Sequence, residues 1–294
     1  MMKRVVILGS TGMLGHMVLK VLSGNQGISA VGTHIGVPTD PFYFNVESGL
    51  GGLEKIFNDV GWPDYVINCI GILKSAINER NSASVLRAIR INSVFPHQLA
   101  EVAVKRGFRV IQISTDGVFS GSKESYDEDT PCDCLDIYGK TKSLGEVNGC
   151  VNFINIRCSI IGRSPIEKMG LVEWLLGQPD GAIVTGFTNQ IWNGISTIQF
   201  ASLCKNIILR DSFDVLRCES AVFHFAPNEP ISKYKLLCLI RDKFHRKIEI
   251  KPVESGPHEL RWVLKTKFQG LKDLYPQGLP PEEIIAELYA YANK

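Results

Sequence analysis

The sequence predicts an α/β protein built on a doubly wound parallel sheet. Apolar runs of strand length alternate with stretches of helix length between residues 3 and 157, and a glycine-rich turn follows the first run. Continuous β-branched runs are typical of strands buried on both faces, and strand–helix alternation predicts parallel pairing. The rhythm changes near Gly162, so we expect a smaller α/β substrate-binding module after it.

The first strand and the turn after it predict a dinucleotide site. A buried strand over 3–8 is followed by the sequence GSTGMLG and then by a helix over 13–23. Glycines at this spacing permit a tight turn and close approach of the backbone to a pyrophosphate, whose charge a helix N-terminus favours. We therefore expect a Rossmann-type domain that binds a nicotinamide dinucleotide. The expected contacts are Gly9, Thr11, Gly12, Met13, Leu14 and Gly15.

The second strand, over 28–33, is expected to end beside the adenosine ribose. An Asp or Glu about 20 residues after the glycines usually holds the ribose 2′-hydroxyl in NAD sites. No acidic residue stands between Gly15 and Asp40, which favours NADPH and leaves NADH open. Because no Arg is nearby either, the candidates for contact with a 2′-phosphate are Thr33, His34 and Lys20.

The next elements are expected to complete the cofactor side of the sheet. We predict a short third strand over 43–46, a helix over 52–60, a buried strand over 65–71 and a long helix over 85–106. Asn92 lies in an apolar part of that helix, where a buried amide needs hydrogen-bond partners such as backbone carbonyls. The further cofactor contacts expected at element ends are Asn45, Val46, Cys69, Ile70, Gly71, Ser114 and Cys158.

A helix expected over 138–148 carries a candidate acid/base pair. Tyr138 and Lys142 are one helical turn apart, and the strand over 109–113 before them ends in Ser-Thr-Asp. A neighbouring ammonium would stabilise the phenolate and lower the pKa of Tyr138, which makes the pair a plausible general acid/base. Thr115, at the carboxyl end of its strand, could hydrogen-bond the same substrate oxygen. Because Tyr-x-x-x-Lys also occurs on ordinary helix surfaces, this interpretation depends on the cofactor motif upstream.

After a strand over 152–157, the second half is expected to form the smaller module and to return to the larger one. The expected elements are a helix over 169–176, a strand over 183–185, strand and loop over 190–194, a helix over 197–210, a strand over 223–227, a helix over 232–244 capped by Ser232, and tail segments over 248–253, 257–267 and 281–292. The predicted division is a dinucleotide-binding domain of 1–162 plus about 190–227, and a substrate-binding domain of about 163–189 and 228–294. Trp192, Asn193 and Trp262 are candidate substrate contacts, although such aromatic residues are often core.

The composition argues against several classes of partner. A formal net charge of +2 with mixed signs gives no field that would recruit nucleic acid or an anionic membrane. The start of the chain lacks a signal-peptide pattern, and the eight cysteines are scattered, so we expect a cytoplasmic protein with free thiols. Cys132 and Cys134 form the only close pair, without the further ligands of a metal site.

Five motifs together resemble the extended short-chain dehydrogenases/reductases, and above all the dTDP-4-dehydrorhamnose reductases. They are GSTGMLG, INS at Asn92, STDGVFSG, YDEDTP at 126–131 and YGKTKSLGE from Tyr138. The resemblance is strong over residues 3 to about 162. It implies NAD(P)H-dependent reduction of the C4 ketone of a nucleotide-linked 4-keto-6-deoxysugar for polysaccharide precursors, in a chain that could form a homodimer.

The resemblance also implies residue roles. Thr115, Tyr138 and Lys142 would be catalytic, with Asn92 as a structural fourth member, and Lys142 would bind the nicotinamide ribose. Asp116, Gly117 and Val118 would contact the substrate. Gly117 departs from the family, which usually has an aromatic residue there, so a larger or differently placed sugar would fit. The first helix lacks the carboxylate with which some members bind a bridging metal, and we therefore expect no metal.

Two alternatives stay open at this point. An epimerase or epimerase/reductase acting on a similar sugar would need a second acid/base pair, and the sequence offers no clear Cys/Lys or His/Glu pair. A non-catalytic, cofactor-binding subunit of another enzyme is the other alternative, since folds do not fix functions. The intact Thr115, Tyr138 and Lys142 argue against that second alternative.

Overall fold

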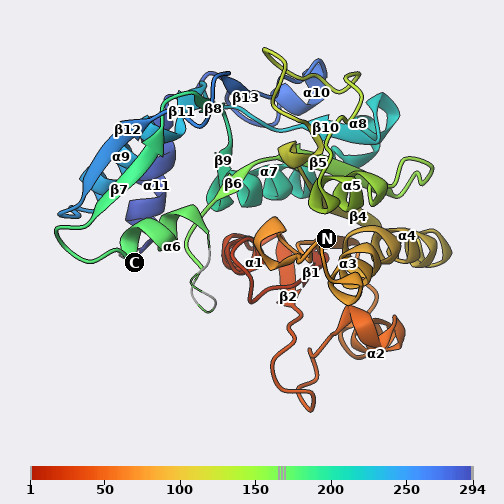
Figure 1. Ribbon diagram of the computed structural model, residues 1–294. Coiled ribbons are helices and arrows are strands. Elements are labelled where there is room, and N and C mark those ends of the chain that lie inside the picture. The colour runs from red at the N-terminus through yellow and green to blue at the C-terminus, as the bar shows by residue number, and fades with distance from the viewer. Residues whose placement is uncertain (1, 165, 167, 169, 293–294) are drawn as a thin grey trace.

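A six-stranded parallel sheet forms the centre of the larger of two units (Figure 1). The computed structural model describes residues 2–164, 166, 168 and 170–292. Neighbouring strands all run parallel, in the order β10-β5-β4-β3-β1-β2. The strands are β1 (Lys3–Leu8), β2 (Ile28–Gly32), β3 (Tyr65–Asn68), β4 (Arg109–Thr115), β5 (Phe153–Cys158) and β10 (Val222–His224). The predicted doubly wound α/β fold is confirmed.

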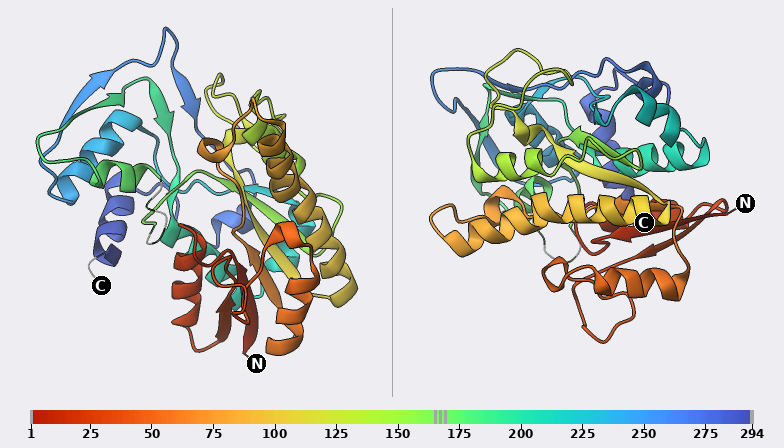
Figure 2. Two further views of the ribbon diagram at one scale, coloured as in Figure 1. Left: turned by 60° about the horizontal axis from the view of Figure 1, so that its bottom comes forward. Right: turned by 90° about the vertical axis from the view of Figure 1, so that its right-hand side faces the viewer.

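Helices cover both faces of this sheet, because alternate side chains of each strand point to opposite faces. Val5 and Ile7 of β1 pack in one apolar cluster with α1, α7 and α8, whereas Val6 and Leu8 pack in a second cluster with α2 and α4. Figure 2 shows this layering from two further directions. The helices are α1 (Gly15–Ser23), α2 (Gly51–Val60), α4 (Phe95–Arg106), α7 (Thr197–Leu209) and α8 (Phe213–Glu219).

The strand order reverses beside β1, and this reversal sets the place of the site. β1 pairs with β2 on one side and with β3 on the other. Ligands of open α/β sheets bind at such a switch point, beyond the carboxyl ends of the strands. Gly9 directly follows β1 and Cys69 directly follows β3, and the Cys69 N–H donates to the Leu8 carbonyl at 3.1 Å.

The smaller unit has its own apolar core and its own short sheets (Figures 1 and 2). Two strands, β7 and β12, pair parallel, and β8 pairs with both β11 and β13. Helices α6, α9 and α11 pack against these strands. The elements of the smaller unit are α6 (Leu171–Leu176), β7 (Ile183–Phe187), β8 (Gln190–Trp192), β11 (Ile231–Ser232), α9 (Lys233–Lys243), β12 (Glu249–Val253), β13 (Leu260–Trp262) and α11 (Pro281–Ala292). A parallel pair of two-residue strands, β6 (Ile160–Ile161) and β9 (Ile195–Ser196), links the two units.

The predicted strand over 43–46 is wrong. Tyr43 makes only an isolated bridge with His34, and Asn45 caps a short 3-10 turn, η1 (Val46–Ser48), by accepting a hydrogen bond from the Glu47 N–H at 3.0 Å. An Asn side chain that bonds the backbone two residues on offers it an alternative to a sheet ladder.

The predicted helix over 85–106 is interrupted. It consists of α3 (Ser82–Ile89), a π-helical turn η3 (Arg90–Val94) and α4. Pro96 has no N–H to give to the carbonyl of Asn92, so the ordinary helical hydrogen bond is missing at that point. The helix predicted over 138–148 is likewise shorter, because α5 (Ile137–Leu144) ends at Leu144 and Gly145 caps it.

The predicted domain division needs two corrections. Residues 190–192 form β8, which pairs only with strands of the smaller unit. Conversely, α10 (Gln269–Lys272) packs on the larger unit, because Leu271 and Leu274 belong to the apolar cluster of β1. The helix expected from residue 169 begins at Leu171 among the described residues, and Met169 lies outside them.

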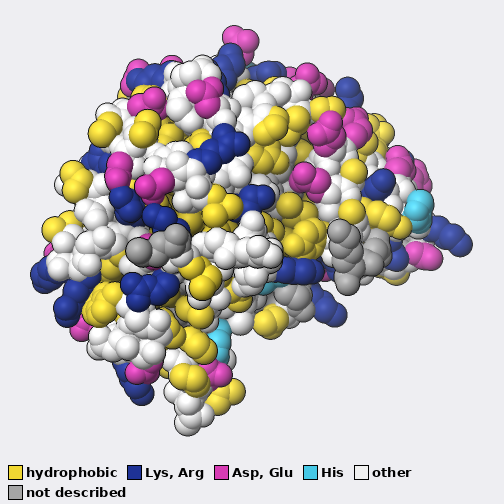
Figure 3. All heavy atoms as spheres, turned by 180° about the vertical axis from the view of Figure 1, so that it is seen from behind, with side chains coloured by type: hydrophobic (Ala, Val, Ile, Leu, Met, Phe, Trp, Pro, Cys, Tyr) yellow, Lys and Arg dark blue, Asp and Glu magenta, His cyan; other side chains and the backbone are white. Residues whose placement is uncertain are grey.

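Charges of both signs are interspersed on the face shown in Figure 3. Across the described ranges, every helix is too short or too polar to cross a lipid bilayer.

Candidate active site

The turn after β1 has the geometry of a pyrophosphate cradle. Gly9 has a φ of 77°, and a Cβ built on Gly15 would lie 2.1 Å from the Gly9 carbonyl oxygen, so both positions require glycine. A Cβ on Gly12 would meet only that same oxygen, at 3.5 Å. Among the described residues, the N–H groups of Thr11, Met13 and Leu14 have no hydrogen-bond partner. Free donors at the start of α1 fit an anionic pyrophosphate.

The three residues expected near the adenosine ribose, Thr33, Lys20 and His34, have different neighbours in the structure. Thr33 is 1% exposed and its hydroxyl accepts a hydrogen bond from the Gly9 N–H at 3.2 Å, so it supports the turn. The ammonium of Lys20 lies 4.4 Å from the ring centroid of Tyr291 in α11. His34 remains partly exposed at the end of β2, where its Nε2 lies 3.1 Å from Asp40.

Asp40 is an acid whose position beside His34 could not be predicted from sequence spacing alone. The loop after β2 folds back, so this carboxylate reaches the strand end although it comes late in the chain. A backbone hydrogen bond from Phe42 lowers the pKa of Asp40, which keeps the group ionised at neutral pH. The structure therefore supplies an acid at the place where the sequence pattern suggested none.

Tyr138 and Thr115 meet at the carboxyl end of β4. The two side chains come together at Gly117, because a Cβ built there would lie 3.1 Å from Tyr138 Cε1 and 3.3 Å from Thr115 Oγ1. Asp136 caps α5 by accepting from the Gly139 N–H at 2.7 Å, and this cap fixes the start of the helix that carries Tyr138. Because residue 117 is glycine, no side chain at this position crowds the ring of Tyr138 or the hydroxyl of Thr115.

Lys142 lies one turn further along α5 and is buried. Its Nζ donates to the carbonyl of Ile113 at 2.8 Å, and burial lowers its pKa to about 8 while Glu146 opposes the shift. Burial raises the pKa of Tyr138 to about 12, and the nearby Thr115 hydroxyl only partly offsets it. The expectation that Lys142 lowers the pKa of Tyr138 is therefore wrong, because desolvation dominates and the ammonium is engaged with the backbone.

Asn92 has the bracing role that the sequence suggested. Its side chain accepts from the Ile72 N–H at 2.8 Å and donates to the Ile72 carbonyl at 3.1 Å and to the Thr141 hydroxyl at 3.2 Å. A Cβ on Gly145 would lie 1.9 Å from the Asn92 carbonyl oxygen, so α5 ends in direct contact with η3. Asn92 therefore fixes the loop after β3 to the helix that carries Tyr138 and Lys142.

The remaining expected cofactor residues surround Lys142 and the glycine turn. Cys69 and Cys158 are close enough to influence the pKa of Lys142, and a Cβ on Gly71 would lie 3.9 Å from its Nζ. Ile70 approaches Gly9, since a Cβ there would lie 3.1 Å from Ile70 Cγ1. Their contact with a cofactor remains a prediction. In the described part of the chain, His, Cys, Asp and Glu side chains form no group of three that could hold a metal ion.

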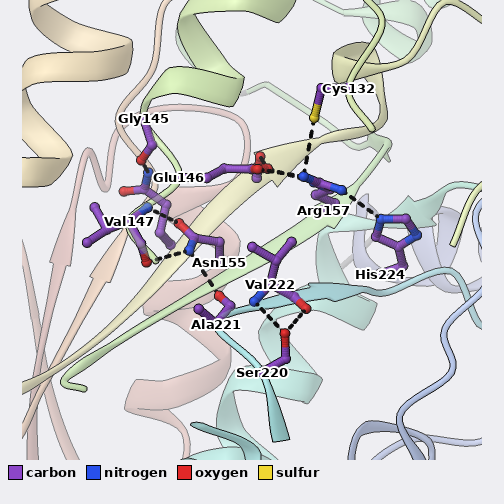
Figure 4. A network of polar contacts seen from close by, with 12 residues as sticks. Cys132, Gly145, Glu146, Val147, Asn155, Arg157, Ser220, Ala221, Val222 and His224 are labelled. Carbon is purple, nitrogen blue, oxygen red and sulfur yellow. Dashed lines mark hydrogen bonds and ion pairs between the residues drawn. The ribbon is translucent and has the colours of Figure 1, made fainter. Parts of the chain in front are cut away.

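Ser114 leads instead into a buried polar network. Figure 4 shows Glu146, Arg157, His224 and Cys132 of this network. Its hydroxyl donates at 2.6 Å to Glu146, which pairs with Arg157 through two hydrogen bonds of 2.7 Å. Arg157 also donates to His224 Nε2 at 3.2 Å and to the Cys132 sulfur at 3.3 Å. Burial, with the charge of Arg157, lowers the pKa of His224 to about 4, so its ring is neutral at pH 7. Sequence reasoning missed this network because its members lie far apart in the chain.

The expected substrate contacts divide into two groups. Trp192 is 4% exposed and lies in the apolar core of the smaller unit. Asn193 exchanges hydrogen bonds of 2.8 and 2.9 Å with the backbone of Leu264, which packs against Val118 and Phe119 of the larger unit. Val118 is fully buried in the cluster of Phe119 and Leu264. Each of these three side chains has a packing or bonding role in the described protein, and their contact with a substrate stays a prediction.

Asp116, by contrast, contacts Thr115, and Trp262 contacts the backbone at Phe119. Asp116 is 8% exposed and accepts from the Thr115 hydroxyl at 3.2 Å, while burial raises its pKa. Trp262 donates from its ring N–H to the Phe119 carbonyl at 3.1 Å. The structure also brings in Lys233, which sequence reasoning missed, from the first position of α9.

Sequence comparison finds one matching family model and several related proteins. A family model described as RmlD substrate binding domain matches residues 2–260. Methionine adenosyltransferase 2 subunit beta of Danio rerio is 26% identical over 265 residues, which cover 83% of this chain and 74% of that protein. The dTDP-4-keto-6-deoxy-D-glucose reductase of Streptomyces niveus is 28% identical over 148 residues, which cover 50% of this chain and 47% of that protein.

Solved structures share the whole fold. The dTDP-4-dehydrorhamnose reductase of Yersinia enterocolitica has a TM-score of 0.77 and 22% identity, with coverage of 98% of this chain and 99% of that chain. The enzyme of the same name from Bacillus anthracis, solved in complex with NADP, has a TM-score of 0.73 and 18% identity, with 99% of each chain covered. At these identities the likeness confirms the fold, and the family match over residues 2–260 shows that the chain belongs to the RmlD substrate binding domain family.

Proposed function

We propose that this protein reduces the C4 ketone of a nucleotide-linked 4-keto-6-deoxysugar with NADPH or NADH. The observation that carries the proposal is the meeting of Tyr138, Thr115 and Lys142 at the carboxyl end of β4, beside the switch point that holds the glycine turn. Dehydrogenase chemistry of this kind needs a proton donor next to a dinucleotide site. The family and the reductase relatives support the same class of reaction.

The residues divide the reaction between binding and proton transfer. A bound nicotinamide would supply the hydride that reaches the ketone carbon. The glycine turn and the free N–H groups of Met13 and Leu14 would hold the pyrophosphate, and Lys142 would hold the ribose. Tyr138, whose pKa is about 12, carries its proton at neutral pH and can donate it to the developing alkoxide. Thr115 would hydrogen-bond the same oxygen, where negative charge develops.

The direct test is turnover with a panel of dTDP-, UDP-, GDP- and CDP-linked 4-keto-6-deoxysugars. We expect loss of reduced-nicotinamide absorbance with one of these sugars, and a matching alcohol by mass spectrometry. Running the panel with NADPH and with NADH measures the coenzyme preference, which the His34–Asp40 pair after β2 would influence. Absence of turnover with every sugar, in protein shown to bind the coenzyme, would contradict the proposal.

Coenzyme binding should depend on pH through Lys142. The pKa of this ammonium is about 8, so it is charged below pH 8 and loses its proton above it. If the charged form binds the ribose, the NADPH dissociation constant should be constant below this pH and rise ~tenfold per pH unit above it. Fluorescence titration of the purified protein measures the constant. Lys142→Met should bind weakly with no such rise, and Lys140→Met, at an exposed position of the same helix, should behave as wild type.

A second candidate function rests on the curated relatives. The Danio rerio relative, and a Pongo abelii relative that is 27% identical over 270 residues, are named as subunits of methionine adenosyltransferase. In that case the chain would bind a dinucleotide and a partner enzyme rather than turn over a sugar. Stoichiometric complex formation with a methionine adenosyltransferase catalytic subunit, together with silence across the sugar panel, would favour this function.

A further inference from the structure

Two neighbouring residues at the end of β4 hold the segment that carries the catalytic pair. The Ile113 carbonyl accepts from Lys142 Nζ at 2.8 Å, and the Ser114 hydroxyl donates to Glu146 Oε1 at 2.6 Å. Lys142 lies near the end of α5, and Glu146 follows Gly145, the residue that caps this helix. Because the two contacts on β4 belong to adjacent residues, the Lys142 ammonium and the Glu146 carboxylate lie close together.

Arg157, and not Lys142, forms the ion pair with Glu146 (Figure 4). The Arg157 guanidinium donates to both Glu146 oxygens at 2.7 Å, so each oxygen already accepts a charge-assisted hydrogen bond. In the described protein, Lys142 forms no ion pair with a carboxylate, and its hydrogen bond is the one to Ile113. An ammonium has three donors, so two of them stay available to a ligand.

Glu146 supplies the negative charge among the groups that influence Lys142. Burial lowers the pKa of Lys142 to about 8, and the groups that oppose this shift are Glu146 and then the thiols of Cys158 and Cys69. Burial raises the pKa of both thiols, so they are uncharged at neutral pH. The phenol of Tyr138, one helical turn earlier, is also uncharged there, because its pKa is about 12. The carboxylate is therefore the anion that opposes the loss of the Lys142 proton.

We propose that Glu146 is a positioning residue of the active site, which keeps the Lys142 ammonium charged while leaving its donors free for the nicotinamide ribose. This inference rests on the proposed function, in which Lys142 binds the coenzyme. A carboxylate paired directly with Lys142 would occupy donors that the ribose needs, and a site without a carboxylate would let burial remove the proton. Arg157 and Ser114 offset the cost of burying the Glu146 charge, so that this charge can lie close to Lys142.

The experiment follows the protonation of Lys142 itself, by an NMR titration of coenzyme-free protein that is isotope-labelled in its lysine side chains. The Lys142 signal is the one that is missing in Lys142→Met. We expect a midpoint near pH 8 in wild type, and a midpoint about one pH unit lower in Glu146→Gln, the effect of removing one nearby charge. Glu146→Asp retains the charge and should titrate closer to wild type. Asp214→Asn is the matched control and should titrate as wild type, because Asp214 also pairs with an arginine, Arg109, but at the opposite end of β4.

Coenzyme binding gives a second measurement of the same charge. A midpoint about one unit lower leaves about a tenth of Lys142 charged at pH 8, against about half in wild type, so NADPH should bind about fivefold more weakly to Glu146→Gln at this pH. About two pH units lower, both proteins carry the charge and should bind NADPH alike. If Glu146→Gln does not fold, Glu146→Met combined with Arg157→Met replaces it, since removal of both charges leaves no buried ion unpaired. The midpoint should fall less in this double variant, because a repelling charge is lost as well.

The outcomes separate this inference from the proposed function. An unshifted Lys142 midpoint in Glu146→Gln, or in the double variant where that replaces it, would overturn the inference and leave the reductase intact. A lowered midpoint without weaker NADPH binding at pH 8 would overturn it as well. A lowered midpoint with weaker NADPH binding, in a protein that reduces no sugar of the panel, would support the inference and remove the reductase. Circular dichroism and urea denaturation report whether each variant is folded.

Discussion

Replacing Tyr138 by Phe should lower kcat for ketone reduction by ~10²- to 10⁴-fold, the usual contribution of a general acid. The phenol is the proton donor next to Thr115, and its pKa of about 12 means that it is protonated in the range where the enzyme would work. Removing the hydroxyl leaves the ring, so NADPH affinity should stay within about twofold of wild type. Steady-state kinetics and a coenzyme titration on the same preparation measure both effects.

A matched control exists elsewhere in the larger unit. Burial also raises the pKa of Tyr275 to about 12, but this ring packs edge-on against Phe225, and the charged group that raises its pKa further is Glu287 of α11. Tyr275→Phe should therefore leave kcat unchanged. Turnover near the wild-type value in Tyr138→Phe would remove Tyr138 from the mechanism, and an equal loss in both variants would point to a structural effect of any buried hydroxyl.

Replacing Arg157 by Met should lower the free energy of unfolding by about 3–5 kcal/mol, because it leaves the Glu146 carboxylate buried without its partner. The side chains of Arg157 and Glu146 are 7% and 4% exposed, and they share two hydrogen bonds of 2.7 Å (Figure 4). Urea denaturation followed by circular dichroism measures the loss. The double variant with Glu146→Met should recover much of it, since removal of both charges leaves no unpaired ion.

The surface of the same sheet provides the control for this second prediction. Arg109 pairs with Asp214 through both oxygens, but the Asp214 side chain is 67% exposed. Arg109→Met should cost less than about 1 kcal/mol, since solvent screens an exposed pair. A comparably small loss in Arg157→Met would show that water or another group satisfies Glu146, and the network would then not be a main source of stability.

The parts of the fold that follow from local pattern could be predicted from the sequence. The strand over 3–8 and the glycine turn depend on apolar runs and backbone freedom, which neighbouring residues encode. Tyr138 and Lys142 were placed correctly on one helix because their spacing is a property of the helix itself. The strand at 43–46 failed because a single Asn side chain competes for the backbone, a choice that an apolar pattern does not reveal.

The rest of the site depends on contacts between distant segments. Asp40 reaches His34 only because a loop folds back, and Lys233 influences Asp116 only because the fold brings the start of α9 near the end of β4. The pKa of Tyr138 was predicted in the wrong direction because the sequence shows a neighbouring lysine but not the burial of the phenol. Burial and long-range proximity are properties of the assembled fold, so spacing alone could not provide them.

The π-helical turn at Arg90–Val94 constrains the length of the chain in a way that its composition does not. In an ordinary α-helix, successive side chains are about 100° apart around the helix axis. The wider turn resets this phase, so that Asn92 faces the Ile72 loop while Phe95 and Leu99 face the sheet. A single deletion here would rotate one of these faces away from its partner. We therefore expect natural variants of this fold to accept substitutions along the segment far more readily than any change in its residue count.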